Sequence, residues 1–404
     1  MNTNNSRGRR AGLGVRILLG MVIGGVIGAA LGQRIGFLQP IGDLFIRLLM
    51  LAAIPLVFFN LLAGLTTLTD LRTFGRLGAK ILAYFAVTTV VALLLGIAVM
   101  LVLRPGEGMT LTAAVSQDVG EVPGIAEILV DLVPANVFAA FAQGNVAQLV
   151  VVAVMLGIAT LLLPVTTRDR LIMLYADLAL LFRKLVDLIL VIAPFGIGAL
   201  MALAVGRYGA LLLGPMAVFV AGVWAAHTIM ALLYLGLLRT MTQWRPVAFL
   251  RETWAVWATT IATTSSLASL SVALDVAERM GLPRPVYSFT LPLGAQINKD
   301  GTAIFLAAVV LFTAQAAGVT LGPGEIFTAM LLAFLLSAGS GGIPGGGFVV
   351  SLILVQAFGL PLEIAAIVGG IYRLVDMGNT TLNVMGDMVG AALVAASEEK
   401  RTWT

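Results

Sequence analysis

Five side chains near the carboxyl end of the chain have the types and the spacing of a binding site. They follow one another at i, i+4, i+8, i+11 and i+15, and they are Tyr372, Asp376, Thr380, Asn383 and Asp387. At about 100° per residue, this spacing keeps all five on one narrow stripe of a helix. Carboxylate, amide and hydroxyl groups on a single helix face can bind an ion or a small polar solute. The alternative is a structural role, in which the carboxylates pair with a buried Arg373.

A second group of oxygen ligands interrupts an apolar stretch that covers residues 286–314. The interrupting residues are Asn298, Lys299, Asp300, Gly301 and Thr302. A break here also frees backbone carbonyls near Gly294 and Gly301. The chain contains no Cys and a single His, and oxygen ligands without sulfur or imidazole suit hard cations rather than zinc or copper. We therefore expect Asp300, Asn383 and Asp387 to help hold Na+.

The composition places both groups in a membrane. Of the 404 residues, 60% are hydrophobic and only 11% are charged, whereas a soluble chain is about 45–50% apolar and about 25% charged. The apolar runs are continuous rather than alternating, which predicts membrane-spanning helices and not a barrel. A charge at the centre of a bilayer costs at least about 2.5–3.5 kcal/mol, so a polar stripe there must face a partner, water, an ion or a substrate.

Six apolar runs before residue 251 are long enough to cross the lipid bilayer. We expect helices near Leu13–Leu31, Leu44–Leu65, Ile81–Leu103, Val146–Leu163, Leu171–Val205 and Leu211–Leu238. Lys and Arg residues collect before the first run and after the second, fourth and sixth, while acidic residues collect in the loop at 105–144. This asymmetry predicts cytoplasmic N- and C-termini and an even number of spans. Because the basic residues are explained by this orientation, no nucleic-acid partner is expected. The first apolar run is expected to be retained as a helix rather than cleaved as a signal peptide.

Two later stretches each place a polar tip between two half-length apolar arms. They are Glu252–Met280, with a tip rich in Ser and Thr, and Leu321–Gly359, with a tip rich in Ser and Gly. Arms this short cannot cross a bilayer, and broken backbone is tolerated at membrane depth only where protein or water satisfies it. Paired broken elements of this kind mark the binding site of many transporters. We therefore expect two re-entrant hairpins and a last helix near Leu362–Ala395, with two Ser- and Gly-rich helix-packing faces as the alternative.

These segments resemble the dicarboxylate/amino acid:cation symporters, a family that includes the glutamate transporter homologues. The resemblance is carried by residues 287–294 running into 298–302, by the tip at 342–345 and by residues 376–387. It implies an all-α polytopic membrane protein with eight transmembrane helices plus two re-entrant helical hairpins. It also implies a homotrimer that works as an elevator-type transporter in the plasma (inner) membrane of a prokaryote.

The same resemblance divides the chain into a fixed scaffold and a moving transport domain. The scaffold is expected to comprise residues 1–76, with helices one and two, and 105–206, with the external loop and helices four and five. The transport domain is expected to comprise residues 77–104, with helix three, and 207–404, with helix six, hairpin one, broken helix seven, hairpin two and helix eight.

The resemblance also implies roles for individual residues. Substrate contacts are expected from Ser265, Ser266, Thr302, Ile343, Pro344, Gly345, Tyr372, Arg373, Asp376, Asn379, Thr380 and Asn383. The Na+ sites are expected at Thr88, Thr89, Gly294, Asn298, Lys299, Asp300, Ser337, Ser340, Asn383 and Asp387. In this scheme Asp376 binds the substrate ammonium, and the second hairpin tip near Ile343 is the gate.

Two departures from the family pattern bear on the substrate. Members that take acidic substrates have an Arg where this chain has Asn379, and some have another where it has Thr264. Because a bidentate Arg is a usual partner of a planar carboxylate, both differences favour a small neutral amino acid. The alternative is a dicarboxylate or acidic amino acid/proton symporter that uses Arg373, three residues before Asp376, as the carboxylate partner. Some dicarboxylate members resemble this chain in having an Arg there.

A third departure bears on the coupling ion. The Asn-Met-Asp motif of the family is Asn298, Lys299 and Asp300 in this chain. An ammonium about 4 Å from a carboxylate contributes about 4 kcal/mol at an effective dielectric of about 20, which is comparable to a bound ion. Our hypothesis is that Na+ is dispensable, or is partly replaced by Lys299 or by H+. The alternative is that Lys299 turns aside to pair with Asp300 and leaves the ion sites intact.

We therefore expect a secondary active symporter that couples a small amino acid to a gradient of Na+, H+ or both, and not an enzyme. Two other functions use the same residues. An intramembrane hydrolase could use Lys299 to activate Ser265 or Ser266, but the sequence shows no clear oxyanion hole and leaves the paired hairpins unexplained. A passive channel needs polar residues along a continuous pore, whereas here they gather on one patch.

Overall fold

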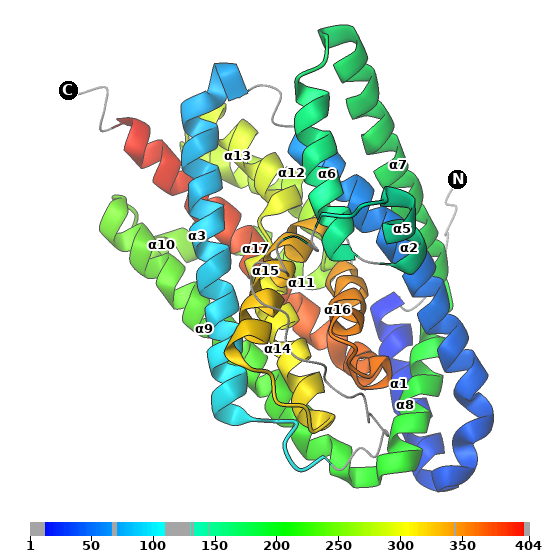
Figure 1. Cartoon of the computed structure of the whole chain (residues 1–404). Coiled ribbons are helices and arrows are strands. Elements are labelled where there is room, and N and C mark those ends of the chain that lie inside the picture. The colour runs from blue at the N-terminus through cyan, green and yellow to red at the C-terminus, as the bar shows by residue number, and fades with distance from the viewer. Residues whose placement is uncertain are drawn as a thin grey trace, which may run out of the picture.

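The computed structural model describes residues 13–66, 71–109, 130, 133–144, 146–342 and 345–399. The regular elements of this part of the chain are all helices (Figure 1). In chain order they are α1 (Leu13–Leu31), the 3-10 helix η1 (Gly32–Leu38), α2 (Gln39–Thr66), α3 (Leu71–Leu103), α5 (Val137–Gln143), α6 (Val146–Leu161), α7 (Val165–Val191), α8 (Ala193–Tyr208), the 3-10 helix η3 (Gly209–Leu212), α9 (Leu213–Met241), α10 (Pro246–Glu252), α11 (Trp254–Thr263), α12 (Ser266–Arg279), α13 (Arg284–Ile297), α14 (Asp300–Ala316), α15 (Pro323–Gly339), α16 (Gly346–Ala357) and α17 (Leu362–Glu399).

Several of these helices are long and apolar enough to cross a membrane. Among the described residues, four stretches qualify by length and composition, which are Leu19–Thr66, Arg76–Leu103, Gly214–Met241 and Arg284–Ala316. The pair α7 and α8 adds a fifth when it is counted as one bent span. The sequence predicts eight spans. The difference arises because Leu19–Thr66 contains two predicted spans, α6 is short, and polar side chains interrupt α17.

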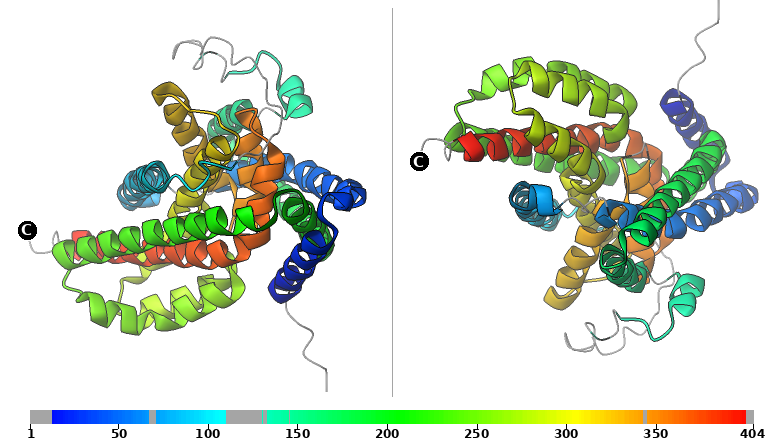
Figure 2. Two further views of the ribbon diagram at one scale, coloured as in Figure 1. Left: turned by 90° about the horizontal axis from the view of Figure 1, so that it is seen from below. Right: turned by 90° about the horizontal axis from the view of Figure 1, so that it is seen from above.

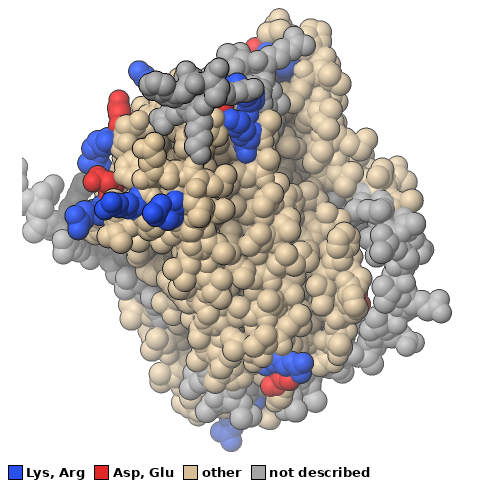
Figure 3. All heavy atoms as spheres, turned by 90° about the vertical axis from the view of Figure 1, so that its left-hand side faces the viewer, with Lys and Arg blue, Asp and Glu red and all other residues tan. Residues whose placement is uncertain are grey.

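The outer surface has the character of a membrane protein. Large apolar side chains such as Leu51, Leu181 and Leu232 are each more than half exposed. On the face shown in Figure 3, charged side chains lie toward the two ends of the molecule, and a broad band of other residues lies between them. This distribution fits a bilayer, in which apolar side chains meet lipid and charged side chains meet the headgroups and water.

The helices form two packed groups (Figures 1 and 2). In the first group, α1 packs on α8, and α2 packs on α6, α7 and α8. In the second, α14 packs against α3, α9, α15, α16 and α17, and α17 also packs on α9, α11 and α13. The groups meet where α17 contacts α8 and where α15 and α16 contact α2.

At the centre of the second group, α14 is enclosed almost completely. Every residue from Asp300 to Ala314 is buried. A helix that is apolar on all sides is expected to be buried, and the sequence of α14 is apolar except near its two ends. The polar residues at its N-terminal end are therefore carried into the interior of the molecule.

The predicted breaks in the chain are present. The first polar tip separates α11 from α12 at Thr264, whose φ of 49° lies in the left-handed region. The second separates α15 from α16, with a φ of 66° at Gly341 and 80° at Gly345. The apolar stretch at 286–314 is interrupted between α13 and α14, at Asn298 and Lys299.

One predicted helix is wrong in its shape. The run Leu171–Val205 was expected to form one long span, but α7 and α8 are separate helices bent by 58°. The bend lies at Ile192, and Pro194 occupies the first turn of α8. Proline fixes φ and lacks an N–H, so it is tolerated at the start of a helix but breaks a helix interior.

Helices α1 and α8 approach closely because small residues line their contact. Gly24 and Gly28 are buried in α1, and a Cβ at either position would overlap the backbone of α8, at Gly198 or at Ala202. Small residues allow such close approach between helices within a membrane.

Replacing Gly24 by Ala should therefore destabilise the protein, by about 1–3 kcal/mol for an overpacked contact. Gly25→Ala is the matched control, because its Cβ would meet Met201 Cγ at 3.8 Å, an ordinary contact, and Ala favours a helix by about 0.5–1 kcal/mol over Gly. In thermal unfolding of the purified protein in detergent, we expect a lower midpoint for Gly24→Ala only. Equal midpoints for the two variants would contradict the close approach.

Candidate substrate and ion site

The tips of the two helix pairs touch each other. The Ser265 hydroxyl donates to the Gly342 carbonyl at 2.6 Å, and the Leu267 amide donates to the same oxygen at 3.3 Å. Ser265 also accepts from the Ala268 amide at 3.2 Å, which caps the first turn of α12. The two polar tips are thus joined by hydrogen bonds, although they lie about 77 residues apart in the chain.

Asp376, in the middle of α17, connects this helix to the second tip. Its side chain is only 5% exposed. One carboxylate oxygen accepts from the Tyr372 hydroxyl at 2.8 Å, and the other accepts from the Gly345 amide at 3.2 Å. Hydrogen bonds to the ionised form stabilise a buried carboxylate, but these two donors are neutral. The charge of Asp376 is therefore held by dipoles and remains suited to a cationic group of a ligand.

Arg373 connects α17 to the first tip. Its guanidinium donates to the Thr264 hydroxyl, and it donates to the Ala262 carbonyl at 3.1 Å. Among the described residues it makes no ion pair with a carboxylate. The structural alternative for the α17 stripe, a pairing of its carboxylates with Arg373, is therefore wrong. A guanidinium has five N–H donors, so this one keeps capacity for a further acceptor beside Asp376.

Asp300, the first residue of α14, is held by two other helices. One carboxylate oxygen accepts from the Thr89 hydroxyl of α3 at 2.6 Å, and the other accepts from the Tyr234 hydroxyl of α9. Asp300 is fully buried. The hydroxyl of Thr88, the other predicted ion ligand on α3, donates instead to the Phe85 carbonyl at 3.2 Å.

Asp387 and Asn383 connect α17 to the break between α13 and α14. The Asn298 amide donates to Asp387 at 3.0 Å and to the Asn383 carbonyl at 3.3 Å. The Asn383 side chain accepts from the Gly301 amide at 2.7 Å and donates to the Thr302 hydroxyl at 3.3 Å. The predicted stripe and the predicted interruption are therefore brought together as one connected polar cluster.

Gly294, a predicted ion ligand, lies directly against this cluster. A Cβ at Gly294 would overlap the Asp387 carboxylate. The absence of a side chain thus lets the carboxylate reach the last turn of α13. In that turn the Gly294 carbonyl accepts from the backbone amide of Asn298 at 2.9 Å.

Lys299 is buried inside the same region, with 1% of its surface exposed. Its ammonium donates to the Ala295 carbonyl at 2.5 Å. In the described part of the chain it makes no ion pair with Asp300, so the expectation that Lys299 turns aside to pair with Asp300 is wrong. The reason is geometric: neighbouring residues at a helix start point in different directions, and Asp300 points toward Thr89 and Tyr234.

Some buried polar atoms of the cluster have no hydrogen-bond partner among the residues that the structure describes. They are Asn298 Oδ1 and both side-chain polar atoms of Asn379. Nearly all buried polar groups in native proteins have a partner, so these atoms are available to a ligand. The described residues contain no group of three or more His, Cys, Asp or Glu side chains arranged to hold a metal. A cation here would therefore depend on amide, hydroxyl and carbonyl oxygens besides one or two carboxylates.

The remaining predicted residues lie in or near the cluster. Ser266 begins α12 and is buried, as are Thr302 and Thr380. The Ser337 hydroxyl donates to the Phe334 carbonyl at 2.8 Å, and the Ser340 hydroxyl donates to the Ser337 carbonyl at 2.7 Å. Both hydroxyls thus lie at the C-terminal end of α15, with their oxygen lone pairs free to accept. Ile343 and Pro344 lie outside the described residues.

Three contributors were missed by the sequence analysis. Tyr234 binds Asp300, Thr264 binds Arg373, and the Asn60 amide of α2 donates to the Gly339 carbonyl at 3.4 Å. Tyr234 and Asn60 are single polar side chains within apolar stretches of α9 and α2, and only this position could have indicated a buried role. Thr264 was considered for the Arg it replaces and not as a partner of Arg373.

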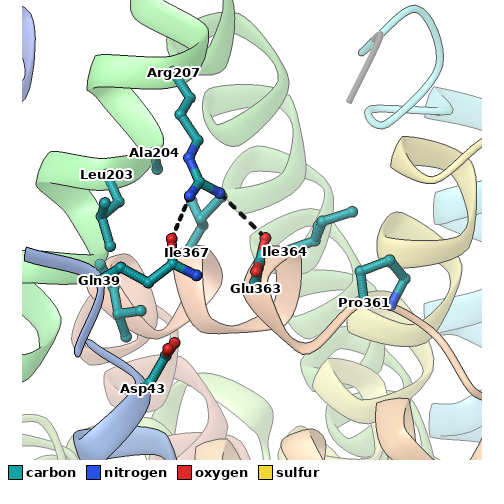
Figure 4. Close-up of a pocket in the computed structure, with 10 residues that line it drawn as sticks. Gln39, Asp43, Leu203, Ala204, Arg207, Pro361, Glu363, Ile364 and Ile367 are labelled. Carbon is teal, nitrogen blue, oxygen red and sulfur yellow. Dashed lines mark hydrogen bonds and ion pairs between the residues drawn. The ribbon is translucent and has the colours of Figure 1, made fainter. Parts of the chain in front are cut away.

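A separate cleft lies between the two helix groups (Figure 4). The Arg207 guanidinium of α8 donates to Gln39 Oε1 of α2 at 2.5 Å and lies 3.5 Å from a carboxylate oxygen of Glu363 of α17. Asp43 also lines this cleft. Along α17, Glu363 is about 20 Å from Asp376 at about 1.5 Å per residue, so the cleft is distinct from the polar cluster.

The hydrolase chemistry is not supported by this geometry. The Ser265 hydroxyl donates to Gly342, and the Lys299 ammonium donates to Ala295, so Lys299 is not the hydrogen-bond partner of Ser265. Instead, polar groups from broken helices and one long helix converge inside an apolar bundle. This arrangement is that of a membrane transport protein, in which discontinuous helices build the binding site.

Comparison with known families agrees with this class. Residues 13–397 match the sodium:dicarboxylate symporter family, and the chain belongs to this family. It is a secondary transporter rather than an enzyme.

Its relatives have transport functions. A proton/glutamate-aspartate symporter of Escherichia coli (strain K12) is 30% identical over 402 residues, which cover 95% of this chain and 91% of the relative. A C4-dicarboxylate transport protein of Solibacter usitatus (strain Ellin6076) is 30% identical over 393 residues, which cover 94% of this chain and 90% of the relative. A proton/sodium-glutamate symport protein of Bacillus caldotenax is 28% identical over 405 residues, which cover 96% of this chain and 95% of the relative. The expectation of a neutral substrate finds no support among these relatives.

Replacing Tyr234 by Phe should destabilise the protein by about 1–3 kcal/mol, because the buried Asp300 carboxylate loses a donor. Tyr84→Phe is the matched control. The Tyr84 ring centre lies 6.5 Å from that of Tyr234, but its buried hydroxyl has no partner among the described residues. Denaturant or thermal unfolding of both variants measures the difference. A cost for Tyr84→Phe as large as that for Tyr234→Phe would show that the hydrogen bond to Asp300 is not the cause.

Proposed function

We propose that this chain is a symporter of acidic amino acids, in which Arg373 binds the side-chain carboxylate of the substrate and Asp376 binds its ammonium. The observation that carries this proposal is the position of Arg373. Its guanidinium is held at the first tip by Thr264 and Ala262, near Asp376, and it has no carboxylate partner among the described residues.

The chemistry of Arg373 supports an acidic substrate. A planar guanidinium binds a carboxylate through two parallel N–H···O bonds. Its two acceptors, a hydroxyl and a carbonyl, are neutral, and it forms no ion pair with a carboxylate among the described residues. The loss of the family Arg at Asn379 is thereby offset by an Arg from another position of the same helix, about 1.7 turns earlier.

Asp376 favours an amino acid over a C4-dicarboxylate. The charge of Arg373 acts on it, but its hydrogen-bond donors are neutral and it forms no ion pair among the described residues, so a substrate ammonium would gain an ion pair there. A C4-dicarboxylate has no ammonium and would bring two more negative charges to a site that already holds Asp376. A C4-dicarboxylate is the second candidate, because proteins named for that transport are among the relatives.

The coupling ion is proposed to bind in the cluster around Asp300, Asn383 and Asp387. Unpartnered Asn298 Oδ1, together with carbonyl and hydroxyl oxygens, supports a hard cation such as Na+. The family description names sodium, and relatives are named for proton and for proton/sodium symport. Na+ and H+ are therefore both proposed as coupling ions.

The transport mechanism is proposed to be elevator-type. In this proposal residues 77–104 and 207–404 move as one transport domain against a scaffold of residues 1–76 and 105–206 in a homotrimer. The eight-span topology, with α11–α12 and α15–α16 as re-entrant hairpins and with cytoplasmic termini, belongs to the same proposal. Its support is the packing of the helices in two groups and the short arms on either side of each tip.

The substrate is tested by ligand binding to the purified chain. L-Aspartate, L-glutamate, succinate, serine and alanine are compared by thermal shift in Na+ and in choline, at two pH values. We expect stabilisation by an acidic amino acid, and stabilisation by serine or alanine alone would contradict the proposal. Arg373→Gln should weaken binding of the acidic amino acid by about 10–100-fold, since a hydrogen-bonded charge contributes about 1.5–3 kcal/mol. Arg104→Gln, in an exposed pair with Glu107, is the control and should bind normally.

The elevator movement is tested by cross-linking. The chain has no Cys, so introduced thiols are the only ones. A bifunctional thiol reagent joining Gln39→Cys to Glu363→Cys, which are linked through Arg207 (Figure 4), should stop uptake into proteoliposomes and preserve substrate binding. The control pair is Lys80→Cys with Ser397→Cys, whose native side chains lie 2.8 Å apart between α3 and α17. Uptake that continues with the first pair fully cross-linked would contradict movement between the two parts.

A further inference from the structure

One buried charge is not explained by substrate binding. Lys299 is among the largest side chains that are fully enclosed, and only 1% of it is exposed. Its position before the first turn of α14 fixes its backbone, because its carbonyl accepts from the Ala303 amide at 2.7 Å. Its ammonium binds the Ala295 carbonyl, four residues earlier, at 2.5 Å. That carbonyl belongs to the last turn of α13, where the interrupted helix leaves carbonyls without helical partners.

The carboxylates nearest in the sequence and in the cluster are those of Asp300 and Asp387. The charge of Lys299 acts on both of them. The only other cation whose charge acts on Lys299 among the described residues is Arg183 of α7, which belongs to the other helix group. Around Lys299, the two buried carboxylates of Asp300 and Asp387 are therefore balanced by one buried ammonium.

This balance leaves one negative charge uncompensated. Buried charges must be paired or must bind an ion, because the interior does not solvate them as water does. A neutral residue at position 299 would leave both negative charges, those of Asp300 and Asp387, uncompensated. The ammonium donates to the Ala295 carbonyl, which would otherwise be free to bind a metal ion. It also brings the positive charge that such an ion would bring.

We propose that Lys299 is a built-in cation that takes the place of one monovalent coupling ion at Asp300 and Asp387. A tethered ammonium compensates the carboxylates in every state of the carrier, and it does not leave at the end of a cycle. This chain consequently binds one cation fewer than the same site would with a neutral residue at 299. The inference rests on the proposed ion-coupled symport, since it concerns how many ions accompany the substrate.

The test counts bound cations without any substrate. Equilibrium binding of 22Na+ to the purified full-length chain, with proton uptake recorded in parallel, measures the number of cations bound at saturation. Lys299→Met should bind about one more monovalent cation than the wild type, as Na+ or as a proton. Lys299→Gln is a second neutral variant, and its amide can keep the hydrogen bond to Ala295 should the Met variant fail to fold. Lys299→Arg retains the charge and should bind the wild-type number.

A charge-balance variant separates this role from a merely structural one. Combining Lys299→Met with Asp387→Asn removes one positive and one negative group, and the number of bound cations should return to that of the wild type. A structural role for Lys299 predicts no change in that number for any folded neutral variant. Equal cation numbers for the wild type and a folded Lys299→Met or Lys299→Gln would overturn the proposal. Because no substrate is present, this result is distinguishable from a failure of acidic amino acids to bind.

Discussion

The burial of carboxylates inside an apolar helical bundle is the constraint on which the rest of this structure depends. Asp300, Asp376 and Asp387 are each at most 5% exposed, and a buried charge without compensation is too costly to persist. Each receives donors from elements far apart in the chain: Asp300 from α3 and α9, Asp376 from the second tip, and Asp387 from the break before α14. The carboxylates therefore determine which helices must meet.

The broken helices serve the same constraint. A continuous helix uses its backbone donors internally and has none to offer within its span. The interruptions at 264, at 298–299 and at 340–345 release amides such as those of Gly301 and Gly345, which bind side chains of α17. The breaks thus supply polar groups at membrane depth, where water is scarce. Lys299 adds a full positive charge beside Asp300 and Asp387.

Much of the fold was predictable because its signals are local. The run Leu13–Leu31 coincides with α1, and the predicted ends of α6 and α9 differ from the observed ends by at most three residues, whereas α2 and α3 begin five and ten residues earlier than predicted. The stripe on α17 and the interruption at 298–302 were also visible, because a polar residue in an apolar run is conspicuous. The bend at Ile192 was missed, since the apolar run continues through it and Pro194 alone marks it. The expected neutral substrate, which finds no support among the relatives, was inferred from Asn379, whereas the direction of the Arg373 side chain cannot be read from spacing.

By itself, the sequence determined that this is a helical membrane protein with interrupted helices and an oxygen-rich polar stripe, because hydropathy, helical period and chain breakers act between residues close in the chain. Only the tertiary structure decided the partners. It placed Tyr234 on Asp300, Thr264 on Arg373 and Ala295 on Lys299, and it separated Lys299 from an ion pair with its neighbour Asp300. Hydrogen bonds depend on the directions of side chains from helices distant in sequence, and those directions are set by how the helices pack.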